Sequence, residues 1–255
     1  MSTPLLEIKG LSLHFGGIVA ISDLDLTVRG GTVHAVIGPN GAGKTSLFNC
    51  ISGIYHPTAG QLLFKDMDLS RLKPHQIAEK GIARTFQNIE LFAHMTVIDN
   101  LLLGCHSRMS TGLVSAAFFW GKALKEEEEY RLEVERIIDF LEIEKVRKKT
   151  VGSLPYGLQK RVEIGRALAM KPELLLLDEP VAGMNVEETE DIARFVLDIK
   201  EEMEITIIMV EHDMGVVMDI ADMVTVLDFG SKIGEGTPAE VQSNPHVIAA
   251  YLGQE

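Results

Sequence analysis

The residue types best suited to chemistry gather in a glycine-rich turn, GPNGAGKTS, that runs from Gly38 to Ser46. The apolar run Val33–Ile37 before the turn favours a strand, and Leu47–Ile51 after it favours a helix. Glycines let successive backbone N–H groups point into one concavity, and the start of the helix adds the positive end of its dipole. The spacing therefore predicts a phosphate-binding loop (P-loop), and the alternative is a turn that holds no ligand.

Each polar side chain of the turn has a separate expected role. The Lys44 ammonium is placed to reach the outer phosphates of a nucleoside triphosphate, and the Thr45 hydroxyl is placed to ligate Mg²⁺. The expected ligands are therefore ATP and Mg²⁺. The loop residues predicted to surround the nucleotide phosphates are Gly38, Pro39, Asn40, Gly41, Ala42, Gly43, Lys44, Thr45 and Ser46.

A pair of acidic residues follows a second apolar run later in the chain. The four leucines of Leu174–Leu177 are typical of a strand buried on both faces of a parallel sheet, and ligands bind at the carboxyl ends of such strands. We expect Asp178 to hold Mg²⁺ directly or through water, and Glu179 to polarise the water that attacks the terminal phosphate. The alternative is an acidic start to the next helix.

Two further candidate residues stand at the ends of expected strands. Thr206–Val210 favours a strand that ends just before His212, which places the imidazole to touch the terminal phosphate unless its role is structural. Leu5–His14 and Ile18–Val28 favour an antiparallel pair of strands. Phe15, in the turn between them, is placed to stack on a nucleotide base, and the alternative is a phenylalanine of the core or rim.

Composition narrows the class of protein. With 255 residues, 46% of them hydrophobic, the chain can build a packed core, and its net charge of −13 argues against general binding of nucleic acid. No apolar run approaches the roughly 18 residues of a membrane span, and the first residues do not form a secretory signal, so we expect the cytoplasm. Cys50 and Cys105 form no paired motif and are expected to be reduced, so redox chemistry is not indicated.

The middle of the chain has a different pattern. Gly81–Gln87 is strand-like, but over residues 88–149 the apolar residues recur at helical spacing, which predicts an inserted helical lobe. Met95–Leu103 and part of Glu126–Ile143 favour helices. The apolar cluster FFW at residues 118–120 is too short to span a bilayer. It is expected to pack within the lobe, to contact a membrane partner or to contact lipid headgroups.

Taken in order along the chain, these motifs resemble those of the ATP-binding cassette (ABC) ATPases, and the resemblance covers essentially the whole length. It implies that Phe15 is the aromatic that stacks on adenine, and that Asp178 and Glu179 end Walker B. It also implies that Gln87 touches Mg²⁺ and links to a membrane partner, and that His212 is the switch histidine. The segment that stands where the family has its D-loop consists of Gly183, Met184 and Asn185.

The fold that the resemblance implies is α/β: a P-loop NTPase (RecA-like) core with an N-terminal antiparallel β subdomain and an inserted α-helical subdomain. The whole chain, residues 1–255, is then a single ABC ATPase domain. The expected division gives residues 1–87 and 170–238 to the nucleotide-binding core with its β subdomain, 88–169 to the helical subdomain with the signature segment, and 239–255 to a C-terminal tail.

The signature segment departs from the family pattern L-S-G-G-Q. In the family, this segment closes over ATP held by the P-loop of a partner subunit. Pro155 stands at the place of the serine, which removes a hydroxyl and an N–H donor, although Gly157 and the following helix remain and Ser153 is a candidate replacement. The residues expected to serve the partner's nucleotide are Ser153, Leu154, Pro155, Tyr156 and Gly157.

Within the family, the helical lobe, the AGMN segment after Walker B and the ending PHVIAAYLG resemble the larger ATPase subunit of branched-chain amino-acid importers. The resemblance implies two membrane permease subunits, a second ATPase subunit (or a homodimer of the isolated chain with ATP) and, indirectly, an extracytoplasmic solute-binding protein, but no nucleic acid. The chain would lie on the inner face of the plasma membrane as a peripheral protein. ATP-driven closure of the dimer would power uptake of branched-chain amino acids or a related small polar solute.

Three other functions stay open on the sequence alone. A soluble ABC ATPase of repair or translation usually carries long coiled-coil insertions or two cassettes, and neither pattern is present here. A P-loop small-molecule kinase would not need the signature helix. A chain that binds ATP mainly as a regulatory partner would not need Glu179 and His212, although Pro155 keeps this option for the opposite site.

Overall fold

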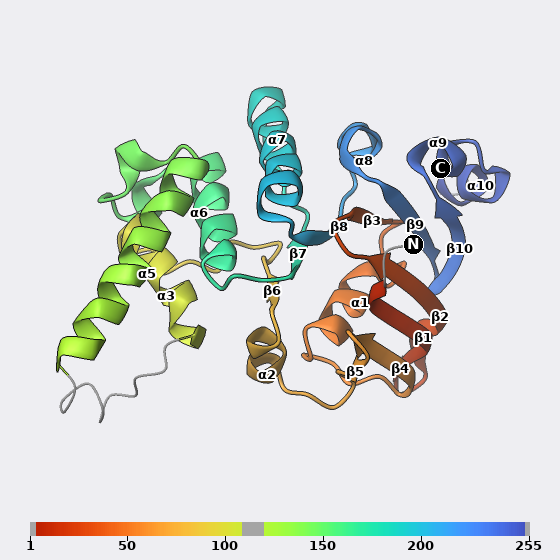
Figure 1. The fold of residues 1–255 in the computed structure, drawn as a ribbon. Helices are drawn as coiled ribbons and strands as arrows, with labels where there is room; N and C mark the ends of the chain where they lie inside the picture. The colour runs from red at the N-terminus through yellow and green to blue at the C-terminus, as the bar shows by residue number, and fades with distance from the viewer. Residues whose placement is uncertain (1–3, 109–119, 253–255) are drawn as a thin grey trace. The chain divides into compact units, whose positions relative to one another are not determined.

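The computed structural model describes residues 4–108 and 120–252 (Figure 1). The chain forms two compact units, a larger one made of Met1–Arg84 and Glu173–Glu255 and a helical one made of Thr85–Pro172. The range 88–169 expected for the helical subdomain falls within the helical unit. The apolar cluster at residues 118–120 lies outside the part of the chain whose side chains the structure describes.

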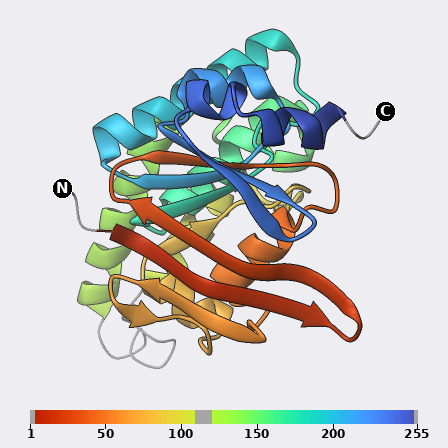
Figure 2. The same ribbon diagram turned by 90° about the vertical axis from the view of Figure 1, so that its right-hand side faces the viewer.

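The larger unit begins with an antiparallel sheet of four strands in the order β2-β1-β4-β5. The long β1–β2 hairpin (red in Figure 2) pairs Glu7 with Thr27 and Ile8 with Leu26, which confirms the predicted antiparallel pair. The strands of this sheet are β1 (Pro4–Phe15), β2 (Ile18–Arg29), β4 (Ala59–Phe64) and β5 (Met67–Asp68).

The second sheet of the larger unit has six strands in the order β10-β9-β3-β8-β7-β6. All neighbouring pairs are parallel except β9 and β10. Every residue of β3, β7 and β8 is buried, because this sheet is covered on both faces, as their unbroken apolar runs predict. The strands are β3 (Val33–Ile37), β6 (Ile82–Arg84), β7 (Leu174–Asp178), β8 (Thr206–Val210), β9 (Met223–Asp228) and β10 (Ser231–Gly236).

Helix α1 (Lys44–Ile51) packs in the core between the two sheets. Its buried residues Leu47, Phe48 and Ile51 share one apolar cluster with side chains of β1, β2 and β4 and with one face of β7 and β8. This packing fixes the helix that begins at Lys44 against the strands that carry the other candidate residues. The other helices of the larger unit are α2 (Pro74–Glu79), α7 (Val186–Met203), α8 (Met214–Ile220), α9 (Pro238–Gln242) and α10 (Pro245–Leu252).

The helical unit is built around a close contact between two of its helices. Gly104 of α3 lies directly against the backbone of Arg166 in α6, and any side chain at Gly104 would collide with the Arg166 carbonyl. The Thr96 hydroxyl caps α3 by accepting a hydrogen bond from Asp99 N–H at 3.2 Å. The elements are α3 (Val97–Cys105), α5 (Trp120–Phe140), α6 (Tyr156–Leu168) and the 3₁₀ turns η1 (His106–Arg108), η2 (Glu144–Val146) and η3 (Val151–Ser153).

The predicted strand Gly81–Gln87 is wrong in its second half, because β6 ends at Arg84. As the edge strand, β6 pairs only with β7, and the pairing stops where Arg84 faces Leu176. The next backbone groups bond to side chains instead: Phe86 N–H donates to the Glu163 carboxylate at 3.2 Å. Polar side chains of α6 therefore make the backbone hydrogen bonds that a longer β6 would have made with β7.

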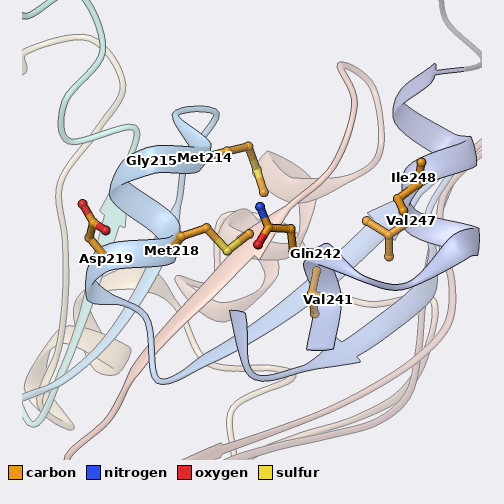
Figure 3. A pocket seen from close by; sticks show the side chains of 8 residues that line it. All are labelled: Met214, Gly215, Met218, Asp219, Val241, Gln242, Val247 and Ile248. Carbon is orange, nitrogen blue, oxygen red and sulfur yellow. The ribbon is translucent and has the colours of Figure 1, made fainter. Parts of the chain in front are cut away.

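A hollow of about 580 Å³ lies between α8, α9 and α10 (Figure 3). Its wall is mostly apolar and includes Met214, Met218, Val241 and Val247, with Asp219 as its charged group. A wall without a basic side chain does not suit phosphate, so this hollow is separate from the predicted nucleotide site. Among residues 4–108 and 120–252, no helix combines the length and apolar character that crossing a membrane requires.

The first testable prediction concerns His34, which is 1% exposed on β3 and pairs its Nε2 with the Thr225 hydroxyl at 2.8 Å. Burial lowers the pKa of His34 from 6.5 to about 4. The unfolded chain therefore binds more protons between these values, so stability falls as the pH drops from 6.5 towards 4, by at most about 3 kcal/mol. Denaturant unfolding should show that the free energy of unfolding depends less on pH over this range in His34→Gln than in the wild type. The exposed His14→Gln is the control, and a wild-type slope in His34→Gln would contradict the prediction.

Candidate nucleotide-binding and catalytic site

The glycine-rich turn joins β3 to α1 in a conformation that requires its glycines. Gly43 has a φ of 102° and immediately precedes α1, and a Cβ there would lie 2.6 Å from the Ala20 carbonyl oxygen. A Cβ at Gly38, which has a φ of 150°, would collide with the Leu227 carbonyl. The turn after β9 supports the loop, because Gly230 N–H donates to the Ala42 carbonyl at 3.0 Å. The loop is therefore enclosed by neighbouring backbone and held in one shape.

The Lys44 side chain folds back into this loop. Its ammonium donates to the carbonyls of Gly38 at 2.6 Å and Pro39 at 2.9 Å, and the residue is 6% exposed. Burial lowers the pKa of Lys44, while the nearby carboxylates of Glu179 and Asp178 raise it. The structure thus brings together the cation of the loop and the acidic pair that follows β7, as the sequence predicts.

Glu179 and His212 meet at the carboxyl ends of two neighbouring strands. Because β7 and β8 pair in parallel with Asp178 opposite Val210, the residues that follow them emerge side by side. The His212 Nε2 lies 2.7 Å from Glu179 Oε1, and Glu179 N–H donates to the Val210 carbonyl at 2.9 Å. Glu179 has a φ of 48°, a left-handed conformation that costs about 1 kcal/mol or more for a residue with a side chain. The hydrogen bond to the Val210 carbonyl holds this backbone conformation, in which the Glu179 carboxylate points to His212.

Glu211 shapes this corner of the site, although the sequence analysis assigns it no role. Its carboxylate is 2% exposed and accepts backbone hydrogen bonds from Val181 at 3.0 Å, His212 at 2.9 Å and Asp213 at 3.3 Å. Burial raises the pKa of Glu211, and these three hydrogen bonds lower it. The side chain ties the turn after Glu179 to the turn that carries His212. Its signal in the sequence is an acidic residue placed directly between a buried strand and a candidate histidine.

Asp178 is buried at the end of β7, with 3% of its surface exposed. An ion pair of 2.8 Å joins its Oδ2 to the Arg84 guanidinium of β6, the neighbouring strand. Thr45 is exposed in the first turn of α1, one residue beyond Lys44. Hydroxyl and carboxylate oxygens are the ligand types that Mg²⁺ prefers in proteins, so the residues predicted for the metal fit it chemically.

Phe15 lies at the end of β1 with 44% of its surface exposed. Its ring meets the Tyr55 ring edge to face, with centroids 5.0 Å apart and planes at 75°. Tyr55, which the sequence analysis does not single out, thus supports the ring from one direction while much of Phe15 stays accessible. This arrangement suits the predicted stacking of Phe15 on a base.

The D-loop residues lie in the larger unit, between β7 and α7. Gly183 has a φ of 75° and Met184 N–H donates to the Val181 carbonyl at 3.2 Å, which forms a tight turn. Asn185 caps α7: its side chain accepts from Glu188 N–H at 3.0 Å, and the Glu188 carboxylate accepts from Asn185 N–H at 3.2 Å. The Asn185 side chain therefore stabilises the start of α7.

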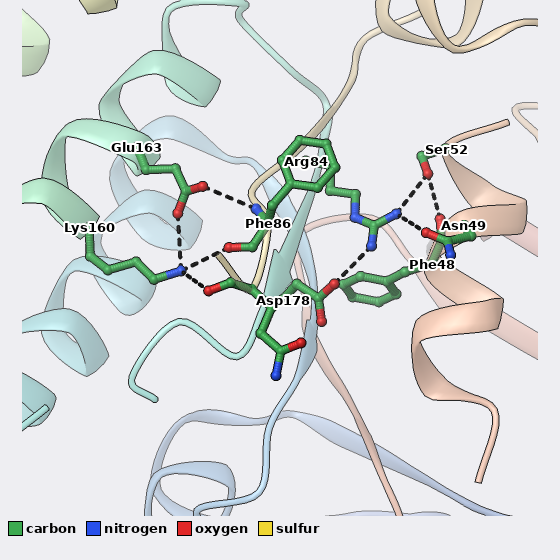
Figure 4. A network of polar contacts seen from close by, with 9 residues as sticks. Phe48, Asn49, Ser52, Arg84, Phe86, Lys160, Glu163 and Asp178 are labelled. Carbon is green, nitrogen blue, oxygen red and sulfur yellow. Dashed lines mark hydrogen bonds and ion pairs between the residues drawn. The ribbon is translucent and has the colours of Figure 1, made fainter. Parts of the chain in front are cut away.

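Gln87 belongs to the helical unit, where α6 holds the backbone of its segment (Figure 4). The Lys160 ammonium donates to the Phe86 carbonyl at 2.9 Å, and the Glu163 carboxylate accepts from Phe86 N–H. Lys160 and Glu163 also form an ion pair of 3.0 Å, and each side chain is 1% exposed. This buried pair fixes the segment before Gln87 to the helix that follows the signature segment.

The signature segment leads into α6 within the same unit. Pro155 precedes the helix without a side-chain cap, and Tyr156 is 41% exposed. The Ser153 hydroxyl donates to the Thr150 carbonyl at 2.7 Å, so it serves its own turn here. Leu154 and Gly157 are buried, and the Leu154 carbonyl accepts from the Gln159 side chain at 2.8 Å. The side chain at the start of α6 that faces solvent is therefore aromatic rather than a hydroxyl.

Comparison with known proteins decides the family. The family described as ABC transporter matches residues 21–182, and the family described as branched-chain amino acid ATP-binding cassette transporter matches residues 231–255. The chain is 39% identical over 254 residues to the high-affinity branched-chain amino acid transport ATP-binding protein BraF of Pseudomonas aeruginosa. The identity is also 39% to the LivG protein of Escherichia coli K12, and each comparison covers 100% of both chains. The chain belongs to the ABC transporter family.

Solved structures agree with this assignment. A nucleotide-free ATP-binding cassette from an ABC transporter superposes with a TM-score of 0.86 at 32% identity, covering 99% of this chain and 100% of the other. A cassette in its ADP conformation gives the same TM-score, identity and coverage. These comparisons confirm the predicted P-loop NTPase fold of an ABC cassette. The chain is an ATP-binding ATPase of the transport-coupled kind.

A stability prediction follows from the buried pair on α6. Lys160→Met leaves the Glu163 charge buried without the Lys160 ammonium, so the free energy of unfolding should fall by about 3–5 kcal/mol. The matched variant Lys160→Met/Glu163→Leu removes both charges and should cost less than Lys160→Met alone. Denaturant unfolding of the two variants and the wild type checks this order. Equal losses in the single and double variants would contradict it.

Proposed function

We propose that this cassette drives an importer of branched-chain amino acids by hydrolysing ATP at the site around Lys44, Asp178, Glu179 and His212. The contact between Glu179 and His212 at the ends of β7 and β8 is the observation that carries the proposal. In this contact a carboxylate and an imidazole lie together beside the proposed phosphate-binding loop. The names of the full-length relatives BraF and LivG support the class of cargo.

Each part of the site has a role in the proposed reaction. The loop N–H groups and the Lys44 ammonium bind the outer phosphates and stabilise the negative charge that develops on them. Glu179 orients the water that attacks the terminal phosphorus, and His212 holds the Glu179 carboxylate in place. Phe15 stacks on the adenine. Thr45 and Asp178 are the residues of the larger unit that would hold Mg²⁺, which would neutralise negative charge on the phosphates.

The second half of the proposal concerns partners. The segment Ser153–Gly157 would close over the ATP of a second ATPase subunit, with Gly183–Asn185 near the same interface, and two permeases would receive the motion. A solute-binding protein outside the membrane would deliver the cargo. The chain would lie on the inner face of the plasma membrane through these permeases. The closed pair of ATPase subunits would bind ATP more tightly than ADP, and this difference in binding free energy would drive the motion of the permeases.

A pull-down tests the partners directly. The chain carrying Glu179→Gln is used as bait on solubilised native membranes, with and without Mg²⁺ and ATP. We expect two hydrophobic permeases and a second ATPase subunit, with more of the second ATPase when ATP is present. Recovery of only soluble proteins or nucleic acid would overturn the transport proposal and leave the ATPase assignment standing.

The role of Glu179 has its own test. Glu179→Gln keeps the shape but removes the charge that orients water, so ATP should still bind while hydrolysis falls by about 10²–10⁴-fold. Phosphate release and equilibrium binding measure the two quantities separately. Glu190→Gln, an exposed change on α7, is the control and should behave as wild type. Hydrolysis at the wild-type rate in Glu179→Gln would contradict the assignment.

The role of Lys44 is distinguished by binding rather than by rate. Lys44→Ala removes the ammonium from the loop, and the affinity for ATP should fall by about 10- to 100-fold. Lys148→Ala, an exposed change in the helical unit, serves as the matched control. Titration of each variant with ATP checks the difference. An unchanged affinity in Lys44→Ala would contradict the P-loop assignment.

A further inference from the structure

Arg84 is a buried cation at the meeting point of three elements of the larger unit. Its side chain is 7% exposed at the end of β6. The terminal nitrogen Nη2 donates to Asp178 Oδ2 at 2.8 Å, and the other terminal nitrogen, Nη1, donates to Asn49 Oδ1 at 2.7 Å and to the Ser52 hydroxyl at 3.0 Å (Figure 4). The guanidinium also lies 5.5 Å from the centroid of the Phe48 ring.

The guanidinium joins the carboxylate of β7 to the last turn of α1. Asn49 lies in that turn and Ser52 is its C-cap, so the positive charge sits where the helix dipole is negative. The same helix begins at Lys44, the cation of the phosphate-binding loop. A planar fork can hold the carboxylate and the helix end at once, which a single ammonium cannot do with the same geometry.

This arrangement limits what Asp178 can do. Its Oδ2 is directed to Arg84, so the plane of the carboxylate is fixed relative to α1. Removal of the guanidinium would take away the 2.8 Å ion pair that holds this carboxylate, which is 3% exposed, and would allow other rotamers of Asp178. Groups that orient a metal ligand in this way affect metal affinity although they do not touch the metal.

We propose that Arg84 is a positioning residue for Asp178, the carboxylate expected to bind Mg²⁺. By fixing Asp178 against α1, Arg84 holds the carboxylate in one orientation towards the metal of Mg-ATP. The inference rests on the proposed function. It adds a residue to which the sequence motifs assign no role. Arg84 is also the last residue of the larger unit and stands three residues before Gln87, so the same fork fixes the point at which the chain leaves for that segment.

The experiment compares ATP affinity with and without the metal. The full chain is purified as wild type, Arg84→Lys, Arg84→Met and the control Arg194→Met, and Kd for ATP is measured in excess Mg²⁺ and in EDTA. Arg194 is a fair control because it also makes ion pairs, with Asp191 and Asp198, and lies 4.4 Å from the Phe195 ring, all within α7. Denaturant unfolding of each nucleotide-free variant reports stability separately.

We expect Mg²⁺ to tighten ATP binding in the wild type and in Arg194→Met. In Arg84→Met this gain should shrink by about tenfold, while Kd in EDTA stays within about twofold of wild type. Arg84→Lys keeps the charge but not the fork, so its gain should be intermediate, and it decides the question if Arg84→Met does not fold.

Two results would overturn the proposal alone, and a third would overturn the proposed function as well. A wild-type gain from Mg²⁺ in the folded Arg84 variants would make Arg84 a purely structural residue, whatever their stability. An equal loss of affinity in EDTA and in Mg²⁺ would place its effect on the nucleotide rather than on the metal carboxylate. Absence of ATP binding by the wild type in both conditions would instead overturn the proposed function, and this inference with it.

Discussion

The site depends on one constraint, the order of three parallel strands. Since β8 lies between β3 and β7, the P-loop after β3, the acidic pair at the end of β7 and the histidine after β8 emerge at one edge of the sheet. The strands are buried at every residue, so their register is fixed by packing on both faces. The strand order alone therefore brings together three residues that are far apart in the sequence, Lys44, Glu179 and His212.

Backbone conformation refines what the strand order provides. Glu179 leaves β7 with a positive φ, and Glu211 holds the turns around it, so the Glu179 carboxylate is presented by a local geometry that no regular element would give. Arg84, on β6, forms an ion pair with Asp178 and is proposed to position that carboxylate in a similar way. In both cases a buried charged side chain fixes a loop or a carboxylate, and its cost in solvation is offset by several hydrogen bonds. Buried charged groups of this kind therefore lie beside the residues proposed to bind the nucleotide.

The sequence predicts much of this fold but little of its supporting contacts. The P-loop, Asp178, Glu179 and His212 can be proposed from the sequence because each follows an apolar run, which is a local pattern. Arg84 and Tyr55 are missed because their roles depend on which strand lies beside β7 and which loop faces β1, and these are tertiary facts. The predicted strand at residues 81–87 extends too far for the same reason, since side chains of α6 take over the hydrogen bonds of Phe86. Asn185 occupies its expected position, yet its amide is used to cap α7.

The central claim is that Glu179 and His212 act as one unit on the attacking water, and a double-mutant cycle tests it most directly. Single-turnover hydrolysis of ATP is measured for wild type, Glu179→Gln, His212→Ala and the double variant. Residues that act as a unit are strongly non-additive, so the double variant should hydrolyse at about the rate of the slower single variant. Losses that multiply in the double variant would show that the two side chains act independently and would contradict the account.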